Sequence, residues 1–299
     1  MMGTFLCLSK RNLKLYFKDK GAFFPSLITP VILLVLYATF LANVYNDSFV
    51  SAFPEGVMTD EKIINAAVSG QLISSLLSVS CVTVAFCANL LMISDKANGI
   101  INDITVTPVR RSLIASSYFA ASLVSTLIIT FTAMAICFAY LIFKGWFLSF
   151  SDVLCVVLDV LLLSLFGTSL SSCIHFFLSS NGQASAVATI ISSGYGFICG
   201  AYMPISTFPE GLQKVLGFLP GTYGTALLKN HLLRGTFAEM ESGGFPAEGV
   251  KAIKEAIGTD VSFFGHNVDV GTMYLVIIAA VILFTAIYVA LNKIKRIKP

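Results

Sequence analysis

Charged residues are scarce in this sequence. They make up only 12% of the 299 positions, while apolar residues make up 56%. Soluble domains carry roughly 25% charged residues, and a soluble chain of this length needs that polar surface to cover its core. The composition therefore excludes an ordinary soluble protein and indicates that lipid is the main solvent.

Several catalytic motifs are also absent. The sequence has no G-x-x-x-x-G-K-[ST] phosphate-binding loop, so the chain has no recognisable means of hydrolysing ATP itself. The motifs H-E-x-x-H and G-x-S-x-G are missing, and the three histidines lie far apart. We expect no catalytic residue, no cofactor or metal bound by this chain, and no nucleic-acid partner.

The seven cysteines show no metal-binding spacing such as C-x-x-C. Six of them fall inside apolar runs, and none falls in the polar connections 46–65 and 236–270. Cysteine at such positions behaves as a small buried apolar residue, and we interpret these seven in that way.

Six continuous apolar stretches are present, and each has about the 20 residues that a membrane-spanning helix needs. They cover residues 23–45, 66–94, 113–143, 152–178, 184–203 and 271–292. Because the runs do not alternate in polarity, a porin-like barrel is excluded. The sequence predicts an all-α integral membrane protein with six transmembrane helices, forming a single domain over residues 1–299.

Basic residues are concentrated in the N-terminal segment, in the connection 95–111 and in the tail after residue 292. These three segments hold 12 of the 19 Lys and Arg residues, and only Asp19, Asp95 and Asp103 among the 16 acidic ones. Lys and Arg near helix ends mark the cytoplasmic side. Both termini and the 95–111 connection are therefore predicted to be cytoplasmic, as an even number of spans requires.

The segment 4–20 has the pattern of an amphipathic helix on the membrane surface. On a helix, Lys10, Arg11, Lys14 and Lys18 fall within an arc of about 100°, where they can meet anionic headgroups. An ordinary positive flank of the first span is the alternative interpretation.

The connection 95–111 is too polar to span a membrane. Ile100, Ile101 and Ile104 are spaced for one helical face, and Pro108 disfavours helix at Thr107. We predict a short amphipathic helix on the inner membrane surface, which either rests on lipid or contacts a cytoplasmic partner.

The fifth predicted span carries small residues every four positions. Such stripes let helix backbones approach closely in lipid, whether the neighbour lies in this chain or in a second copy. The stripe comprises Ala184, Ala188, Ser192, Gly196 and Gly200.

Residues 204–270 follow the fifth predicted span, and 204–235 form the first part of this segment. Three prolines, Pro204, Pro209 and Pro220, together with several glycines, interrupt short apolar pieces there, which predicts a broken or re-entrant helix at the outer face. The remainder, 236–270, is expected to form an external cap with a short helix around 247–257.

Asp159 is the only acidic residue well inside a predicted span. An ionisable group in lipid marks a function or a specific partner, so a structural partner, a wet rim and a cargo or proton role all remain open. Asn89 is expected to make helix-to-helix hydrogen bonds. We assign Asp159, Asn89 and Tyr195 to a translocation pathway.

Three stretches in this order resemble the type-2 ABC exporter permeases. DKANGIINDITVTPVRRS is similar to the coupling-helix segment of that family, although Ala97 and Asn98 stand where members often carry charge. GAYMPISTFPEGLQKVLGFLP resembles the outer re-entrant hairpin before the last helix, and PGTYGTALLKNHLLRG resembles the P-x-T-Y stretch that ends in arginine and glycine. The matching positions are Asp95, Gly99, Thr107, Pro108, Arg110, Arg111, Gly200, Pro204, Pro209, Pro220, Thr222, Tyr223, Arg234 and Gly235.

The resemblance implies a permease of the bacterial plasma (inner) membrane that exports an amphiphile, such as a drug, a peptide antibiotic or a lipid-linked molecule. It implies two cytoplasmic ATPase subunits, which bind ATP and Mg, and a second permease subunit in a homodimer or heterodimer. The contact with the ATPase would comprise Asp95, Gly99, Ile100, Ile101, Ile104, Thr107, Pro108 and Arg110. Helix packing or the dimer interface would involve Ala188, Ser192, Gly196 and Gly200. The outer re-entrant element would include Pro204, Pro209, Pro220 and Tyr223.

Two other functions fit the sequence as well. A proton- or sodium-coupled secondary carrier would use Asp159, although such a carrier usually has further ionisable groups inside its spans. The second alternative is a membrane scaffold or sensor subunit that does not transport anything. The EAA-x3-G loop of importers is not matched by Glu255 to Gly258, which argues against import.

Overall fold

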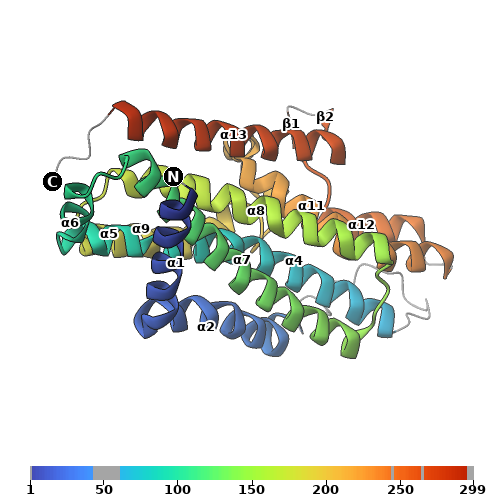
Figure 1. Cartoon of the computed structure of the whole chain (residues 1–299). Coiled ribbons are helices and arrows are strands. Elements are labelled where there is room, and N and C mark those ends of the chain that lie inside the picture. The colour runs from blue at the N-terminus through green and yellow to red at the C-terminus, as the bar shows by residue number, and fades with distance from the viewer. Residues whose placement is uncertain (1, 43–60, 244–245, 264–265, 295–299) are drawn as a thin grey trace.

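The computed structural model is a bundle of long helices, and it describes residues 2–42, 61–243, 246–263 and 266–294. Helices α4, α7, α8 and α13 run along the bundle, and α1 lies across it (Figure 1). The short helix α6 lies at one end, near the N-terminus, and α12 lies toward the other (Figure 1). We call these the α6 end and the α12 end.

The elements follow one another as α1 Met2–Lys18, α2 Lys20–Leu36, the π-helix η1 Tyr37–Leu41, α4 Glu61–Ala88, α5 Leu90–Ala97, α6 Ile100–Val106, α7 Arg111–Lys144, α8 Phe150–Phe176, α9 Asn181–Ile198, the 3-10 helix η2 Ile205–Thr207, α10 Glu210–Gly217, α11 Pro220–Ser242, α12 Ala247–Ile257, β1 Ser262–Phe263, β2 His266–Asn267 and α13 Val270–Ile294. The two strands pair antiparallel, with Phe263 opposite His266. The predicted all-α class is therefore confirmed, with one small hairpin between α12 and α13 in the part of the chain that the structure describes.

Four helices among the described residues are long and apolar enough to cross a membrane. They are Glu61–Ala97, which joins α4 and α5, and the helices α7, α8 and α13. They correspond to four of the six predicted spans. A fifth candidate consists of Met2–Lys18 together with Phe23–Thr39, which meet at an angle of 76°. That bend separates the predicted surface helix from the first predicted span.

The fifth predicted span, 184–203, corresponds to α9, which is not among these candidates. The polar residues at its start and the hydroxyl residues along it reduce its apolar character. The helix also ends earlier than predicted, at Ile198, because Gly200 adopts a left-handed conformation with φ of 71°. The amide of Ala201 then bonds the carbonyl of Gly196 at 2.9 Å, which caps the helix. Six spans therefore remain a prediction.

Helix α4 forms the centre of the bundle. It contacts α2, α7, α8, α9 and α11, and almost all of its side chains are buried. The main hydrophobic core is built around it from α8 and α11, with α13 completing one side. Helices α7, α8 and α11 therefore pack directly on α4, and α13 joins the bundle through α8 and α11.

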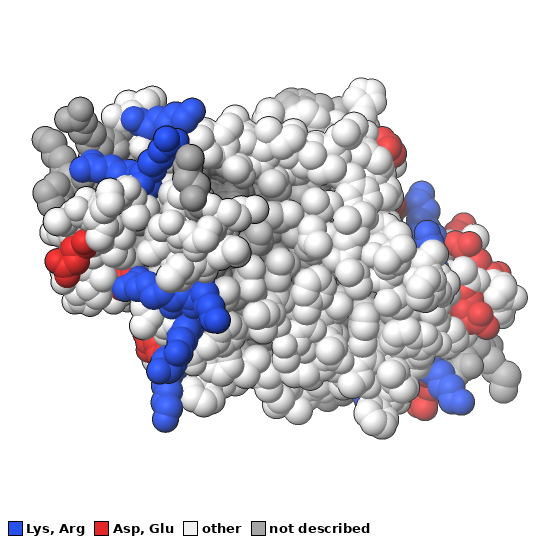
Figure 2. Space-filling view, viewed as in Figure 1, with Lys and Arg blue, Asp and Glu red and all other residues white. Residues whose placement is uncertain are grey.

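Charged side chains lie at the two ends of the molecule, and the broad middle carries none on the face shown in Figure 2. Lys and Arg gather at the α6 end, whereas acidic and basic residues mix at the α12 end (Figure 2). An uncharged middle between charged ends is what a bilayer requires of a protein that crosses it.

The segment between α9 and α13 contains the predicted breaks. Pro209 precedes α10 and Pro220 is the first residue of α11, where proline is tolerated because no amide donor is needed. The short helix predicted around 247–257 is α12. The last part of the first predicted span, most of the 46–65 connection, and the basic tail residues Lys295, Arg296 and Lys298 lie outside the described residues.

Candidate functional site

The short helix α6 is separated from both of its neighbours by defined turns. Gly99 has a φ of 76°, a left-handed conformation that glycine adopts without a steric penalty. At the other end Thr107 is extended, with ψ of 153°, because Pro108 excludes helix there. The predicted end of this helix near Thr107 is confirmed.

The faces of α6 differ from the predicted arrangement. Ile101 is turned into the chain and only 5% exposed, whereas Val106 is 87% exposed. Ile100 and Ile104 are half-buried. The three isoleucines therefore do not form one outward face, and the expectation that Ile101 is free to contact a partner is wrong. The exposed residues of this segment are Asn102, Asp103, Val106, Thr107, Pro108 and Arg110.

Asp95, at the end of α5, is buried and bonded within the chain. Its Oδ2 accepts from Arg11 Nη1 at 2.6 Å and from the Tyr118 hydroxyl at 2.5 Å. Beside this pair, Asn12 Nδ2 donates to Ser117 Oγ at 3.4 Å. The carboxylate thus connects α1, α5 and α7, and it positions α6 from behind rather than lying on the exposed surface.

The sequence pattern places Arg11 with the lysines on one arc that meets anionic headgroups. The structure turns Arg11 inward to Asp95 and leaves Lys10, Lys14 and Lys18 exposed. Sequence reasoning missed this ion pair because its partners are 84 positions apart. A second link comes from Lys96, whose Nζ donates to the carbonyl of Leu178, just after α8, at 2.8 Å.

Asn89 lies where α4 meets α5, at the centre of a buried hydroxyl cluster. Its Nδ2 donates to Ser171 Oγ at 2.7 Å and to Ser172 Oγ at 3.2 Å, both on α8. Its Oδ1 accepts from Ser122 Oγ of α7 at 2.8 Å. The predicted helix-to-helix hydrogen bonding of Asn89 is therefore confirmed.

Asp159 of α8 is buried between two partners. His231 Nδ1 of α11 lies 2.6 Å from its Oδ2, and the Tyr274 hydroxyl of α13 donates to its Oδ1 at 2.6 Å. His231 is also buried, and its ring stacks on that of Tyr274. Asp159 thus has a structural partner in each of two helices. These partners could not be identified from the sequence, because they lie 72 and 115 positions away from Asp159.

The small stripe of α9 packs inside the chain. Ala184, Ala188 and Gly196 are buried, and α9 contacts α4 and α5. A Cβ at Gly196 would lie 2.2 Å from the ring of Tyr202, so the glycine makes room for this ring. Gly200 lies beyond the end of the helix and is not part of its stripe. Ser192 is half-buried at the edge.

Tyr195 is buried beside the start of α11, where a Cβ at Gly221 would lie 2.4 Å from its hydroxyl. This hydroxyl is buried and makes no hydrogen bond in the described part of the chain. Tyr195, Asn89 and Asp159 therefore all lie inside the bundle, on separate elements and with separate surroundings. The structure does not gather them at one site.

The broken element between α9 and α11 is held together by its own hydroxyl groups. The Tyr223 hydroxyl donates to the carbonyl of Gly217 at 2.6 Å, and Thr222 Oγ1 donates to the carbonyl of Leu216 at 2.9 Å. Both bonds turn α10 back onto the start of α11. The P-x-T-Y stretch therefore holds the turn after Pro220 closed.

Arg234 and Gly235 join α11 to the start of α8. Arg234 Nη2 pairs with Asp152 Oδ1 at 2.5 Å, and Asp152 also caps α8 together with Ser149. A Cβ at Gly235 would collide with the carbonyl of Phe147. The arginine and glycine that end this motif thus have a packing role.

Among the described residues, no group of three or more His, Cys, Asp or Glu side chains is placed to hold a metal ion. The seven cysteines are unpaired, and Cys81, Cys137, Cys173 and Cys199 are buried. Those four match the interpretation of cysteine as a small buried residue, whereas Cys7 is exposed on α1.

Comparison with known proteins gives one positive result. A search of curated proteins finds no match for the chain. The family model described as ABC-2 type transporter matches residues 4–232, which is more than half of the sequence and includes α6 and most of α11. The resemblance to type-2 ABC permeases is thereby confirmed. The chain belongs to the ABC-2 type transporter family and is a multi-pass membrane transport subunit rather than the ATPase.

Proposed function

We propose that this chain is the permease subunit of an ATP-driven exporter and that α6 is its contact with a separate cytoplasmic ATPase. The observation that carries the proposal is the exposed surface of α6 around Asp103 and Val106, within the region that matches the family. An apolar side chain that is 87% exposed at the basic end of a membrane protein is well placed for a partner.

The buried contacts behind α6 support a role in transmitting force. Asp95 binds Arg11 and Tyr118, and Lys96 binds the carbonyl of Leu178. A push on α6 would therefore act on α1, α7 and α8 together, because α5 is bonded to all three regions. In this proposal two ATPase subunits supply the push, with ATP and Mg bound on them.

A second permease subunit, identical or different, is proposed to pack on the outward face of α9. Ser185, Thr189, Ser193 and Phe197 recur every four residues on a face about 100° around the helix from the small stripe, and all are exposed. Thr189 and Ser193 donate their hydroxyl groups to backbone carbonyls one turn earlier, so this face is compatible with lipid or protein. This replaces the predicted interface on Ala188, Ser192, Gly196 and Gly200.

A cross-linking experiment tests this interface. Cysteine introduced at Ser193 is expected to cross-link two subunits, while cysteine at Thr132, an exposed hydroxyl residue on α7, is not. Equal cross-linking at both positions above the background of the unmodified chain would contradict the α9 interface.

The proposed cargo is an amphiphile, with a drug as first choice and a peptide antibiotic or lipid-linked molecule next. The passage would run between the two α9 faces, since Asn89 and Asp159 are occupied within the chain. Both termini and α6 would face the cytoplasm of a bacterial cell, in agreement with the basic residues at the α6 end (Figure 2).

The test is Val106→Asp in the complex purified from native membranes. Loss of a central apolar contact and gain of a charge are expected to lower ATP-driven export about tenfold or more, with the chain still folded. Val215→Asp, an equivalent change on exposed α10, is the control and should leave export unchanged.

Two outcomes would overturn the proposal. One is full export by Val106→Asp, and the other is purification of the native chain without any ATPase under conditions that preserve comparable complexes. If transport instead followed a proton or sodium gradient and was lost in Asp159→Asn, the secondary carrier would be the correct function.

A further inference from the structure

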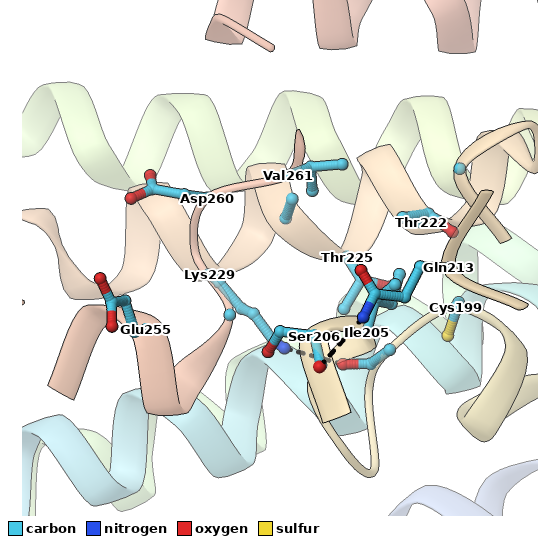
Figure 3. A pocket seen from close by; sticks show the side chains of 14 residues that line it. Cys199, Ile205, Ser206, Gln213, Thr222, Thr225, Lys229, Glu255, Asp260 and Val261 are labelled. Carbon is cyan, nitrogen blue, oxygen red and sulfur yellow. Dashed lines mark hydrogen bonds between the residues drawn. The ribbon is translucent and has the colours of Figure 1, made fainter. Parts of the chain in front are cut away.

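A cavity of about 240 Å³ lies between the broken outer element, α11 and the end of α12. Its walls include Ser206, Gln213 and Thr225, with Lys229 reaching in from α11 (Figure 3). Pockets that hold drug-sized molecules usually measure roughly 300–1,000 Å³. This cavity is therefore sized for a small polar group rather than for a whole amphiphilic cargo.

Lys229 is the buried cation of this cavity, only 2% exposed. Its Nζ donates to the carbonyl of Gly200 at 2.7 Å and to the carbonyl of Ile257 at 2.8 Å. These carbonyls lie at the ends of α9 and α12, where helix dipoles are negative and attract a cation. The ammonium thus holds two helix ends together.

One donor of Lys229 remains available. An ammonium group has three N–H donors, and within the described residues only two of them have acceptors. No carboxylate of the described chain forms an ion pair with Lys229. A buried charged donor without an acceptor is costly, and a ligand oxygen in the cavity would remove that cost.

The same cavity also has an acidic wall. Asp260 lines it, is exposed, and forms no ion pair or hydrogen bond with the described part of the chain. Glu255 lines it too, and its carboxylate lies 3.9 Å from Lys251. In Figure 3 both carboxylates lie to one side of Lys229, while Ser206 and Gln213 lie to the other. Two opposite charges thus line one small cavity without pairing to each other.

We propose that this cavity binds a zwitterionic group, with its anionic oxygen on Lys229 and its ammonium toward Asp260. A plain anion would leave Asp260 as a repulsive neighbour, and a plain cation would leave the third Lys229 donor unfilled. Phosphoethanolamine, free or as a lipid headgroup, has the required charges. The inference does not depend on the direction of transport or on the ATPase.

The test measures binding to the full-length chain in detergent by calorimetry, with three probes. Phosphoethanolamine is expected to bind at least about tenfold more tightly than inorganic phosphate or ethanolamine, because each lacks one of the two charged contacts. Equal binding of phosphate and phosphoethanolamine would overturn the proposal, since the acidic wall would then contribute nothing.

Two variants assign the contacts. Asp260→Asn, at an exposed position, should weaken phosphoethanolamine binding about tenfold and leave phosphate binding unchanged or stronger. Glu248→Gln, an acidic residue of α12 that does not line the cavity, is the matched control and should bind like the native chain. Native affinity in Asp260→Asn would overturn the proposal.

Lys229→Gln should abolish binding of phosphate and phosphoethanolamine alike. Because Lys229 also holds two helix ends together, the thermal midpoint of the Lys229→Gln variant is measured without ligand. This measurement separates loss of binding from loss of fold. The Asp260→Asn result decides the proposal if Lys229→Gln is unfolded.

The choice of surrounding lipid distinguishes a lipid headgroup from a soluble molecule as the source of the ligand. In nanodiscs of phosphatidylethanolamine, bound headgroups should compete with soluble phosphoethanolamine. Its affinity for the chain should then be at least about fivefold weaker than in phosphatidylglycerol nanodiscs. Such competition identifies the bilayer as the source. Equal affinity in the two lipids identifies a soluble zwitterion, and either result keeps the site.

Discussion

Helices α4 and α13 are both apolar enough to cross a membrane, yet they occupy opposite environments. In the most apolar window of the α4–α5 helix 78% of residues are buried inside the chain, against 17% for α13. Helix α4 is surrounded by α2, α7, α8, α9 and α11, whereas α13 packs mainly on α8 and α11. The more apolar of the two helices is the one on the outside.

This difference shows how a membrane inverts the usual order of polarity. Helix α4 buries serines at positions 69, 74, 75, 78 and 80. These hydroxyl groups are tolerated inside because they are small and can bond to neighbouring backbone, as Ser75 does to the carbonyl of Ala201 at 2.7 Å. Most of the apolar side chains of α13 are exposed instead, and its polar contacts to other helices, such as Tyr274 to Asp159, lie on the side that packs against the chain.

The contact of α4 with α8 is expected to be the most sensitive point. A Cβ at Gly167 would lie 2.9 Å from the carbonyl oxygen of Cys81 and 3.0 Å from the Cα of Val82, and neither backbone atom can yield easily. Gly167→Val should lower the free energy of unfolding by about 3 kcal/mol, measured by chemical denaturation in detergent.

The matched control is Gly194→Val on α9, where a Cβ meets nothing within 4 Å. Both changes place a β-branched residue in a helix, so the difference between them reports packing alone. Equal losses of unfolding free energy in the two variants would show that α4 does not pack on α8 as closely as its burial indicates.

Attachment of α13 is expected to depend on Asp159. Asp159→Ala leaves His231 and Tyr274 without their shared acceptor, which should cost about 2 kcal/mol. Amide exchange should accelerate in α13 and remain slow in α4. Asp269→Ala, which removes an exposed carboxylate bonded to nearby Thr272 in the first turn of α13, should change exchange at the start of α13 alone. Uniform acceleration in both helices would contradict this view.

Asn89 provides a smaller test of the polar interior. Asn89→Ala removes the bonds to Ser122 and Ser171 and should cost about 1 kcal/mol, since interhelical hydrogen bonds in membranes are individually weak. Asn292→Ala on α13, whose side chain donates to the carbonyl of Tyr288 one turn away on the same helix, should have less effect on the thermal midpoint. A larger drop in the thermal midpoint for Asn292→Ala than for Asn89→Ala would be inconsistent with a central position of α4.

The smallest effect is expected on the outer face of α13. Ile282 is 63% exposed, so Ile282→Ala should change the free energy of unfolding by less than about 0.5 kcal/mol because lipid fills the space. Ile73→Ala on α4, at a fully buried position, should cost about 2–5 kcal/mol. Similar losses for both would mean that another chain covers α13.

Much of the fold could be predicted because it depends on local properties of the chain. Apolar length predicted α4, α7, α8 and α13, and proline marked the end of α6 and the starts of α10 and α11. The same reasoning overestimated α9, since Gly200 looks like a fifth member of the stripe in sequence but ends the helix in the structure.

The sequence by itself determined that this chain is a helical membrane protein, where its helices break, and which family it resembles. Only the tertiary structure decided that Arg11 and Ile101 turn inward, that Asp159 meets His231 and Tyr274, and that Lys229 joins two helix ends. The physical reason is that an apolar side chain gains little by preferring protein to lipid, so periodicity does not orient a membrane helix. Polar partners far apart in sequence meet only once the helices have packed.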